Sequence, residues 1–351
     1  MTIVDPGAND LLLALRQASG DAGLSLEDGP RPLNAQGSVQ FVQPGSTETR
    51  LAIPAVIRLC DRAANATREA IIEDHLYRSG FPTPPVLLIG SQGDALGGAW
   101  LLIELVSGPS VRIGSGRGPV QAARSIRALW QRPALLAELT ARLHGIDPDP
   151  VDRRLANTGS GLDWHKFLWD RATSVRGSGA AEVVDWLERN EPEPSRLALS
   201  HGDLHPGNIV ISANGPQIID WGIGCLAPPA RDIACTMFAL LTTGSQAPGP
   251  TGGVFSALGR QLSDRFLRRY RALAPIALPA AELDWHRVLY SMNRVFWATL
   301  DDEEASVANS GDPLAVRAAR ADGVLDRELP IHARIIDDIT GVDLLRDLVN
   351  T

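Results

Sequence analysis

The amino-acid sequence predicts an α+β protein built from two lobes. In the first hundred residues, short runs with β-type alternation are separated by turn residues, which indicates strands. Beyond Gly108 the apolar residues recur mainly at three- or four-residue spacing, which indicates helices. The 351 residues are enough for two such units, each with its own core. We therefore predict an N-terminal lobe over 1–105, with an antiparallel sheet plus a helix, and a mainly α-helical C-terminal lobe over 106–351.

The N-terminal lobe is predicted to combine four strands with two helices. The first helix covers 10–18, where leucines follow a capping Asn9 or Asp10. The second covers 65–79 and ends at the run FPTPP (81–85), because proline cannot continue a helix. Strands are predicted at 38–42, 51–59, 86–89 and 100–106.

The C-terminal lobe reads as a series of helices interrupted by one short β region. The helix at 133–144 has a proline at its start and Gly145 just past its end, the usual asymmetry of helix termini. The β region lies at 208–220, with a turn at Asn214-Gly215. Further helices are predicted at 163–175, 180–190, 231–242, 255–273, 281–300, 313–325 and 342–349.

Composition excludes several classes of function. The net charge of −8 argues against a nucleic-acid partner, because binding a phosphate backbone needs a basic surface. No apolar run approaches the roughly 18–20 residues of a membrane span, and the first residues lack the basic character of a signal peptide. We expect no membrane partner and a cytoplasmic location. The three cysteines are too scattered for a disulfide framework or a metal site.

One pattern carries chemistry. The run LSHGDLHPGNIV (199–210) is followed, after the predicted hairpin, by IIDWG (218–222). Phosphoryl transfer needs a carboxylate that orients the acceptor hydroxyl and takes its proton, and Asp203 is placed for that role. Asn208, five residues on, and Asp220 on the next strand supply the oxygen ligands that Mg²⁺ prefers. The order D-x-x-x-x-N, hairpin, D-W-G is the catalytic pattern of protein kinases, with Trp221 in place of phenylalanine.

These motifs resemble the aminoglycoside phosphotransferase family, which shares a bilobal protein-kinase-like fold with choline and homoserine kinases. The resemblance is dense from about 56 to 235. It includes HGDLHPGN with IDW, the run REAIIEDHL (68–76) before FPTP, WLLIELVSG (100–108), LHGIDP (143–148) and ARDIA (230–234). It implies a Mg²⁺-dependent enzyme that moves the γ-phosphate of ATP or GTP to a hydroxyl group of a small molecule.

The resemblance also implies roles for individual residues. Asp203 is the expected catalytic base, and Asn208 and Asp220 are the expected Mg²⁺ ligands. Arg58 stands where kinases have a strand lysine, so we expect it to contact the α- and β-phosphates and to pair with Glu69. Arginine is permanently charged and binds phosphate well, and Lys166 is the only lysine among the 33 basic residues. The remaining nucleotide contacts are expected from the backbone of Glu104, Leu105 and Val106 and from a loop containing Gly37 and Ser38.

Two histidines in the motif are interpreted as scaffolding. His201 and His205 are expected to hydrogen-bond to the backbone or to Asp220 and so to stiffen the loop. Asp232 is expected to cap a helix and anchor the loop rather than to act as a ligand.

The acceptor is not identified by these motifs. Helices at 160–190 and 255–305 are expected to line its pocket, and Asp284-Trp285 with the carboxylates at 301–304 would suit a cationic acceptor. The competing interpretation is a buried stripe formed by Trp285, Leu289, Met292 and Phe296.

Four functions therefore stay open. The first is an O-phosphotransferase for an aminoglycoside-type or other antibiotic, with a role in antibiotic resistance. The others are a metabolic kinase for choline, homoserine or a sugar, a macrolide phosphotransferase, and a nucleotide-binding regulatory pseudokinase. The presence of Asp203, Asn208 and Asp220 disfavours the last.

Overall fold

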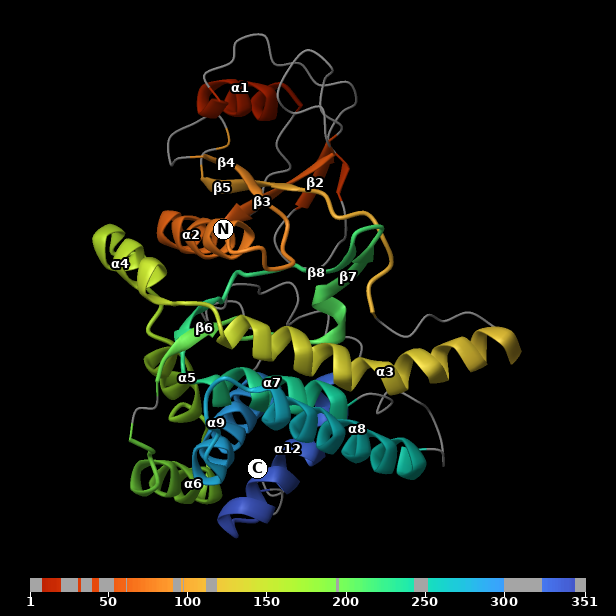
Figure 1. The fold of residues 1–351 in the computed structure, drawn as a ribbon. Coiled ribbons are helices and arrows are strands. Elements are labelled where there is room, and N and C mark those ends of the chain that lie inside the picture. Colours follow the sequence, from red (N-terminus) through yellow and green to blue (C-terminus); the bar gives the residue numbers. More distant parts are fainter. Residues whose placement is uncertain are drawn as a thin grey trace.

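The computed structural model places a sheet-containing lobe above a helical lobe (Figure 1). It describes residues 8–19, 31–32, 40–43, 54–60, 62–90, 96, 98–111, 119–193, 196–242, 252–299 and 324–344. Within these ranges, no helix is long and apolar enough to cross a membrane. The predicted α+β class with a helical C-terminal part is confirmed.

The upper lobe is built on a five-stranded antiparallel sheet with the strand order β1-β2-β3-β5-β4. Its strands are β1 (Arg31–Pro32), β2 (Gln40–Gln43), β3 (Ala55–Cys60), β4 (Val86–Gly90) and β5 (Ala99–Glu104). Helix α1 (Ala8–Ser19) packs on one face, through Leu15 against Ile57 and Trp100. Helix α2 (Ala63–Arg78) packs on the other face, through Ala66 and Ala70 against Leu101.

Strand alternation explains how the sheet presents Arg58. Side chains along a strand point to opposite faces in turn. Because Ile57 belongs to the α1 side, its neighbour Arg58 belongs to the α2 side, where its register partner Leu101 also packs. The only charged residue of β3 is thereby turned toward helix α2 and toward the helical lobe beyond it.

The lower lobe contains most of the helices and two separate cores. The first core joins α2 to the catalytic region and to the long helices α3, α7 and α8. The second holds α5, α6, α9 and α12 together. The bounds are α3 (Pro119–His144), α4 (Asp149–Thr158), α5 (Trp164–Ala172), α6 (Ser178–Arg189), α7 (Pro229–Leu241), α8 (Gly252–Leu273), α9 (Ala280–Thr299) and α12 (Val324–Thr340).

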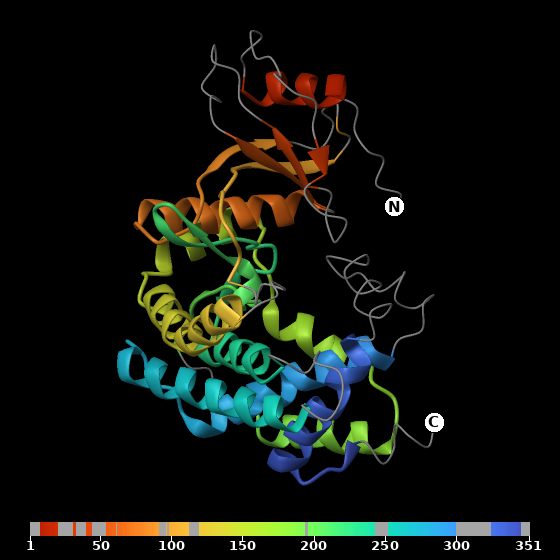
Figure 2. The same ribbon diagram turned by 90° about the vertical axis from the view of Figure 1, so that its right-hand side faces the viewer.

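Two small antiparallel sheets lie where the lobes meet, as Figures 1 and 2 show. Strand β6 (Ala198–Ser200) pairs with β9 (Cys225–Ala227), and β7 (Ile209–Ser212) pairs with β8 (Gly215–Ile218). The β7–β8 pair is the predicted hairpin at Asn214-Gly215. Both sheets flank the motif residues, so the chemistry expected from the sequence lies between the lobes.

The structure departs from the predicted elements in several places. Helix α3 does not begin at Pro133, which lies inside it. The prediction took the proline as a start signal because an interior proline removes one backbone hydrogen bond and clashes with the preceding turn, yet α3 continues through this position. Helix α4, the β6–β9 pair and most of α12, which contains Pro330, were not predicted. The predicted helix at 313–325 lies almost wholly outside the described residues, and the one at 342–349 lies outside them from 345 onward.

Candidate active site

The catalytic loop is held by its own histidines. The backbone N–H of Asp203 donates to Nδ1 of His201 (3.2 Å), and Nε2 of that ring bonds to the carbonyl of Ile219 (3.0 Å). Nδ1 is therefore the acceptor and Nε2 the donor. Burial lowers the pKa of His201, so the ring is uncharged at neutral pH. The backbone N–H of Gly207 donates in the same way to Nδ1 of His205 (2.9 Å). Both rings bond to the backbone, as the scaffolding interpretation expects.

Asp203 presents its carboxylate at the surface of this loop. About half of its side chain is exposed (46%), which leaves room for an acceptor hydroxyl. Its Oδ2 lies 3.6 Å from Nε2 of His205, and its Oδ1 lies 3.8 Å from Sγ of Cys235. The base expected from the sequence is thus accessible and flanked by two groups that can orient it.

Asn208 and Asp220 lie side by side at the end of the β7–β8 hairpin. The backbone N–H of Ile219, next to Asp220, donates to the carbonyl of Asn208 (3.0 Å). The side-chain nitrogen of Asn208 donates to the carbonyl of Asp203 (3.0 Å), so its amide oxygen is left to act as a ligand. The positive charge of Arg58 lowers the pKa of Asp220, which is ionised at neutral pH.

This donor set fits a magnesium ion. An amide oxygen and an ionised carboxylate are hard ligands, and Mg²⁺ is commonly held by one or two carboxylates plus phosphates and water. In the described part of the chain, no group of three or more His, Cys, Asp or Glu residues is arranged to hold a metal by itself. The arrangement therefore suits an ion that is completed by the phosphates of a nucleotide.

Arg58 connects the sheet to this hairpin. Its Nη1 lies 2.8 Å from Oε1 of Glu69 on α2 and 2.6 Å from Oδ1 of Asp220. The predicted Arg58–Glu69 pair is present, and the contact with Asp220 is an addition that the sequence did not predict. One helical turn after Glu69, the carboxyl group of Glu73 is also buried near these residues, and its Oε2 has no hydrogen-bond partner in the structure. We call Arg58, Glu69, Glu73 and Asp220 the Arg58 cluster.

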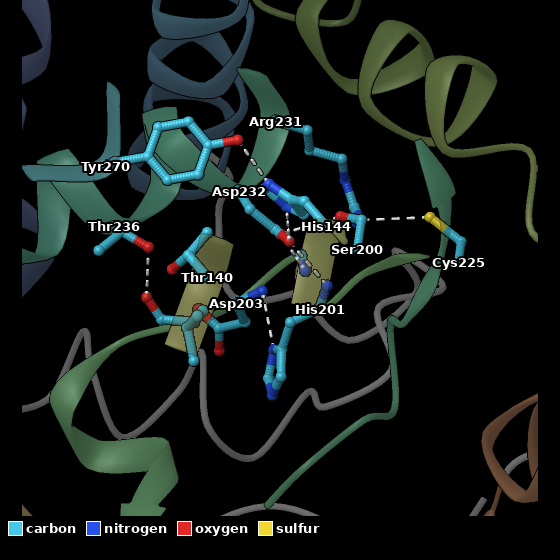
Figure 3. A network of polar contacts seen from close by, with 12 residues as sticks. Thr140, His144, Ser200, His201, Asp203, Cys225, Arg231, Asp232, Thr236 and Tyr270 are labelled. Atoms are coloured by element: carbon cyan, nitrogen blue, oxygen red, sulfur yellow. Dashed lines mark hydrogen bonds and ion pairs between the residues drawn. The ribbon is translucent and has the colours of Figure 1, made fainter. Parts of the chain in front are cut away.

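A second polar cluster lies behind the catalytic loop (Figure 3). The carboxylate of Asp232 accepts hydrogen bonds from Ser200 Oγ (2.9 Å), the His201 N–H (3.0 Å) and the Gly202 N–H (2.6 Å). Its fourth contact is His144 Nε2 (3.2 Å), and Nδ1 of that ring bonds to the hydroxyl of Tyr270 (2.8 Å). Asp232 anchors the loop, as its interpretation from the sequence expects.

Arg231 completes this second cluster, which we call the Asp232 cluster (Asp232, Arg231, His144, Ser200 and Tyr270). Its Nη1 donates to Ser200 Oγ (2.9 Å) and lies 3.2 Å from Cys225 Sγ. Burial alone would raise the pKa of Asp232, but the hydrogen bond from His144 and the charge of Arg231 lower it below its usual range. His144 and Arg231 were not assigned these roles from the sequence, although a charged pair within an otherwise apolar helix (α7) was a usable signal.

The segment predicted to hold the nucleotide base follows strand β5. The backbone N–H of Glu104 donates to Pro85 (3.2 Å), and that of Leu105 donates to Pro54 (2.9 Å). These two donors are therefore committed within the protein. Within the described residues, the N–H of Val106 has no such backbone partner, so it is a group of the predicted set that could meet a base. Gly37 and Ser38 lie outside the described residues.

Cys235 lies beside Asp203, and Tyr290 lies beside Cys235. The hydroxyl of Tyr290 lies 3.6 Å from Cys235 Sγ, which in turn faces Asp203. Trp285, Leu289, Met292 and Phe296 are buried in the second core, so the core interpretation of this stripe is confirmed. Asp284 pairs with Arg287 of its own helix (2.9 Å), and residues 301–304 lie outside the described residues. The proposed carboxylate–indole site at 284–285 is not formed.

Comparison with known proteins identifies the family. The profile of the phosphotransferase enzyme family matches residues 45–276, which is more than half of the chain. The chain belongs to this family. The resemblance predicted from the motifs is confirmed. An aminoglycoside 3'-phosphotransferase from Streptomyces fradiae is 30% identical over 230 residues, which are 60% of this chain and 74% of that protein.

Other curated relatives are much longer proteins. Acyl-CoA dehydrogenase family member 11 from Gallus gallus is 28% identical over 211 residues, which are 57% of this chain and 26% of that protein. The chain thus spans about a quarter of the length of these relatives.

Solved structures share the fold. A putative aminoglycoside phosphotransferase from Ralstonia eutropha JMP134 superposes with a TM-score of 0.57 at 17% identity, covering 93% of this chain and 98% of its own. Spectinomycin phosphotransferase in complex with ADP and spectinomycin gives 0.56 at 14% identity, covering 92% and 97%. A choline/ethanolamine kinase family protein from Mesorhizobium loti gives 0.54 at 14% identity, covering 92% and 98%. At these identities the likeness establishes the kinase-like fold alone.

Proposed function

We propose that this phosphotransferase moves the γ-phosphoryl group of ATP to a hydroxyl group of a small molecule, with Mg²⁺ held by Asn208 and Asp220. The observation that carries the proposal is that two hydrogen bonds bring Asp203, Asn208 and Asp220 together at one hairpin: the Asn208 side chain donates to the Asp203 carbonyl, and the N–H of Ile219, next to Asp220, donates to the Asn208 carbonyl. When bound, Mg²⁺ would neutralise charge on the phosphate oxygens. The ionised Asp220 and the oxygen of Asn208 are the groups that would hold it.

Asp203 is the proposed base. Its half-exposed carboxylate accepts the proton of the acceptor hydroxyl as the new O–P bond forms and the bond from Pγ to the bridging β-phosphate oxygen breaks, which releases ADP. His205 Nε2 lies near Oδ2 and steadies that oxygen, while Cys235 stands at Oδ1. Burial raises the pKa of the Cys235 thiol, so it is uncharged and does not compete for the proton.

Arg58 and the segment after β5 are proposed to bind the nucleotide. Arg58 is the cation closest to the Mg²⁺ ligand Asp220, which suits contact with the α- and β-phosphates. The Val106 N–H would meet the edge of the base, since the neighbouring N–H groups are committed. The ADP in the solved spectinomycin phosphotransferase complex supports ATP over GTP as the donor.

For the acceptor we propose a hydroxylated antibiotic of the aminoglycoside type. The support is the 30% identity to the Streptomyces fradiae aminoglycoside 3'-phosphotransferase. Choline, homoserine, sugars and macrolides are the alternatives, and the shared fold of the choline/ethanolamine kinase family protein keeps small alcohols among them.

The acceptor and donor are decided by one panel. Nucleotide turnover is measured with ATP and with GTP against aminoglycosides, macrolides, choline, homoserine and sugars, with Mg²⁺ or with EDTA. We expect Mg²⁺- and acceptor-dependent turnover of ATP, and phosphorylated aminoglycoside detected by mass spectrometry. Turnover with a small alcohol alone would replace the acceptor class. Tight nucleotide binding without turnover on any acceptor would support the pseudokinase and overturn the proposal.

A further inference from the structure

The Arg58 guanidinium is paired with the Asp220 carboxylate, which is the group that the metal ion would need. A single nitrogen, Nη1, lies 2.6 Å from Oδ1 of Asp220 and 2.8 Å from Oε1 of Glu69. Asp220 is half exposed and Glu69 is buried, so the guanidinium bridges a buried anion and an accessible one. A cation at this oxygen opposes the approach of a second cation.

The surrounding backbone is shaped for this contact. A side chain at Gly222 would overlap Nη2 of Arg58, so the absence of a Cβ there lets the guanidinium lie against the loop. Arg68 on α2 holds the same loop through the carbonyl of Gly222 (2.7 Å). Asp220 itself has a left-handed backbone (φ 71°), which is the only such conformation among the non-glycine residues that the structure describes. Asparagine and aspartate tolerate this region best, and such strain commonly marks functional positions.

We infer that Arg58 acts as an exchangeable counter-cation for Asp220, holding this carboxylate closed to metal until a nucleotide's phosphates draw the guanidinium away. The inference rests on the proposed function, because it takes Asp220 as a metal ligand. It predicts that the metal ion binds together with the nucleotide and not before it. Divalent metal binds poorly to the nucleotide-free protein and binds well together with a nucleoside triphosphate, because the phosphates give Arg58 another anion.

The inference is tested by metal binding alone, without phosphoryl transfer. Free Mn²⁺, which replaces Mg²⁺ as the probe, is titrated with the nucleotide-free protein and followed by electron paramagnetic resonance. We expect Arg58→Gln to raise the Mn²⁺ affinity roughly tenfold, because a screened unit charge beside the ligand is removed. Arg62→Gln makes the same change of net charge at an exposed position and should leave the affinity within about twofold. Adding Asp220→Asn to Arg58→Gln should abolish the gain.

A second variant guards against misfolding, since Arg58→Gln leaves Glu69 buried without this partner. Gly222→Ala keeps every charge but pushes the guanidinium away from Asp220, so it should also raise the Mn²⁺ affinity. Unchanged or weaker Mn²⁺ binding in folded samples of both variants would overturn the inference.

Failure of the proposed metal site has a different signature. If Asp220→Asn alone does not weaken the binding of Mn²⁺ together with ATP, then Asp220 is not a metal ligand and the proposed function fails at that residue. If it does weaken that binding while neither Arg58→Gln nor Gly222→Ala raises the affinity for Mn²⁺ alone, only the counter-cation role fails.

Discussion

The Arg58 cluster and the Asp232 cluster use the same kinds of side chain for different ends. Each contains an arginine and at least one carboxylate beside the catalytic loop, Asp232 alone in one cluster and Glu69, Glu73 and Asp220 in the other. In the Asp232 cluster every member is buried and the carboxylate accepts four hydrogen bonds. In the Arg58 cluster Asp220 is half exposed, its backbone is strained, and Glu73 has a buried oxygen without a partner.

The difference separates scaffold from function. A buried network whose donors and acceptors are all matched has one arrangement and fixes the backbone around it. A cluster with excess carboxylate and an exposed end can exchange partners, which suits a site that binds phosphate and metal. The two clusters therefore differ in whether their polar groups are hydrogen-bonded and whether they are exposed, rather than in residue type.

The same substitution in each cluster should give the largest contrast in stability. Asp232→Asn removes the charge that three donors and His144 face, and we expect a loss of about 3–5 kcal/mol in the free energy of unfolding. Asp220→Asn breaks a half-exposed pair and should cost no more than about 1 kcal/mol. Urea unfolding of both variants measures this. Equal losses would contradict the division between scaffold and function.

Asp220→Asn, which has the small effect on stability, should have a large effect on activity. Changes in residues that only orient metal ligands already cost about 10–100-fold. Asp220→Asn should therefore lower kcat/KM by about a hundredfold or more while the protein stays folded. Raising the Mg²⁺ concentration should recover part of the loss if the defect is in metal binding. Full activity at low Mg²⁺ would remove Asp220 from the ligand set.

Two glycines, Gly202 beside the Asp232 cluster and Gly222 beside the Arg58 cluster, allow the same comparison of stability. Gly202 has a φ of 79°, and a side chain there would overlap the Arg231 guanidinium, which three hydrogen-bond partners hold in place. Gly202→Ala should cost about 1–3 kcal/mol. At Gly222 the obstacle is Nη2 of Arg58, at the end of a side chain whose partner Asp220 is half exposed, so Gly222→Ala should cost less than about 1 kcal/mol. Thermal unfolding of the pair tests this, and a larger loss at Gly222 would reverse the assignment.

The smallest expected effect concerns Glu73 and pH. Burial, reinforced by the charge of Glu69, raises its pKa well above the ordinary 4.5. When the pKa of a carboxyl group is raised in the folded state, the folded protein loses stability as the pH rises above the pKa of the unfolded state. The loss stops once the pH exceeds the raised pKa of the folded state. Glu73→Gln should remove this decline, so that the variant is more stable than the parent at neutral pH. Unfolding from pH 4 to 8 tests the slope, and parallel curves would show that Glu73 does not titrate there.

Much of the site could be predicted because most of its residues lie close together in the sequence. Asp203 and Asn208 share one loop, Asp220 follows one hairpin, and strand alternation with α2 explains Arg58 and Glu69. The Asp232 cluster could be predicted only in part, because His144 and Tyr270 are brought together from helices 126 residues apart. The three-residue strands β6 and β9 are too short to leave an alternation pattern. Arg58's contact with Asp220 depends on the packing of the two lobes, which no sequence spacing reveals.

The most direct test of the account is the role of the Asp203 carboxylate. Asp203→Asn keeps the backbone bonds to His201 and Asn208 and removes only the proton acceptor. Asp185→Asn, on the exposed side of α6, is the matched control. With an acceptor from the panel, we expect kcat of Asp203→Asn to fall about 10²–10⁴-fold while the Kd for ATP changes less than about twofold. A kcat close to that of the parent protein would contradict the assignment of Asp203 as the base.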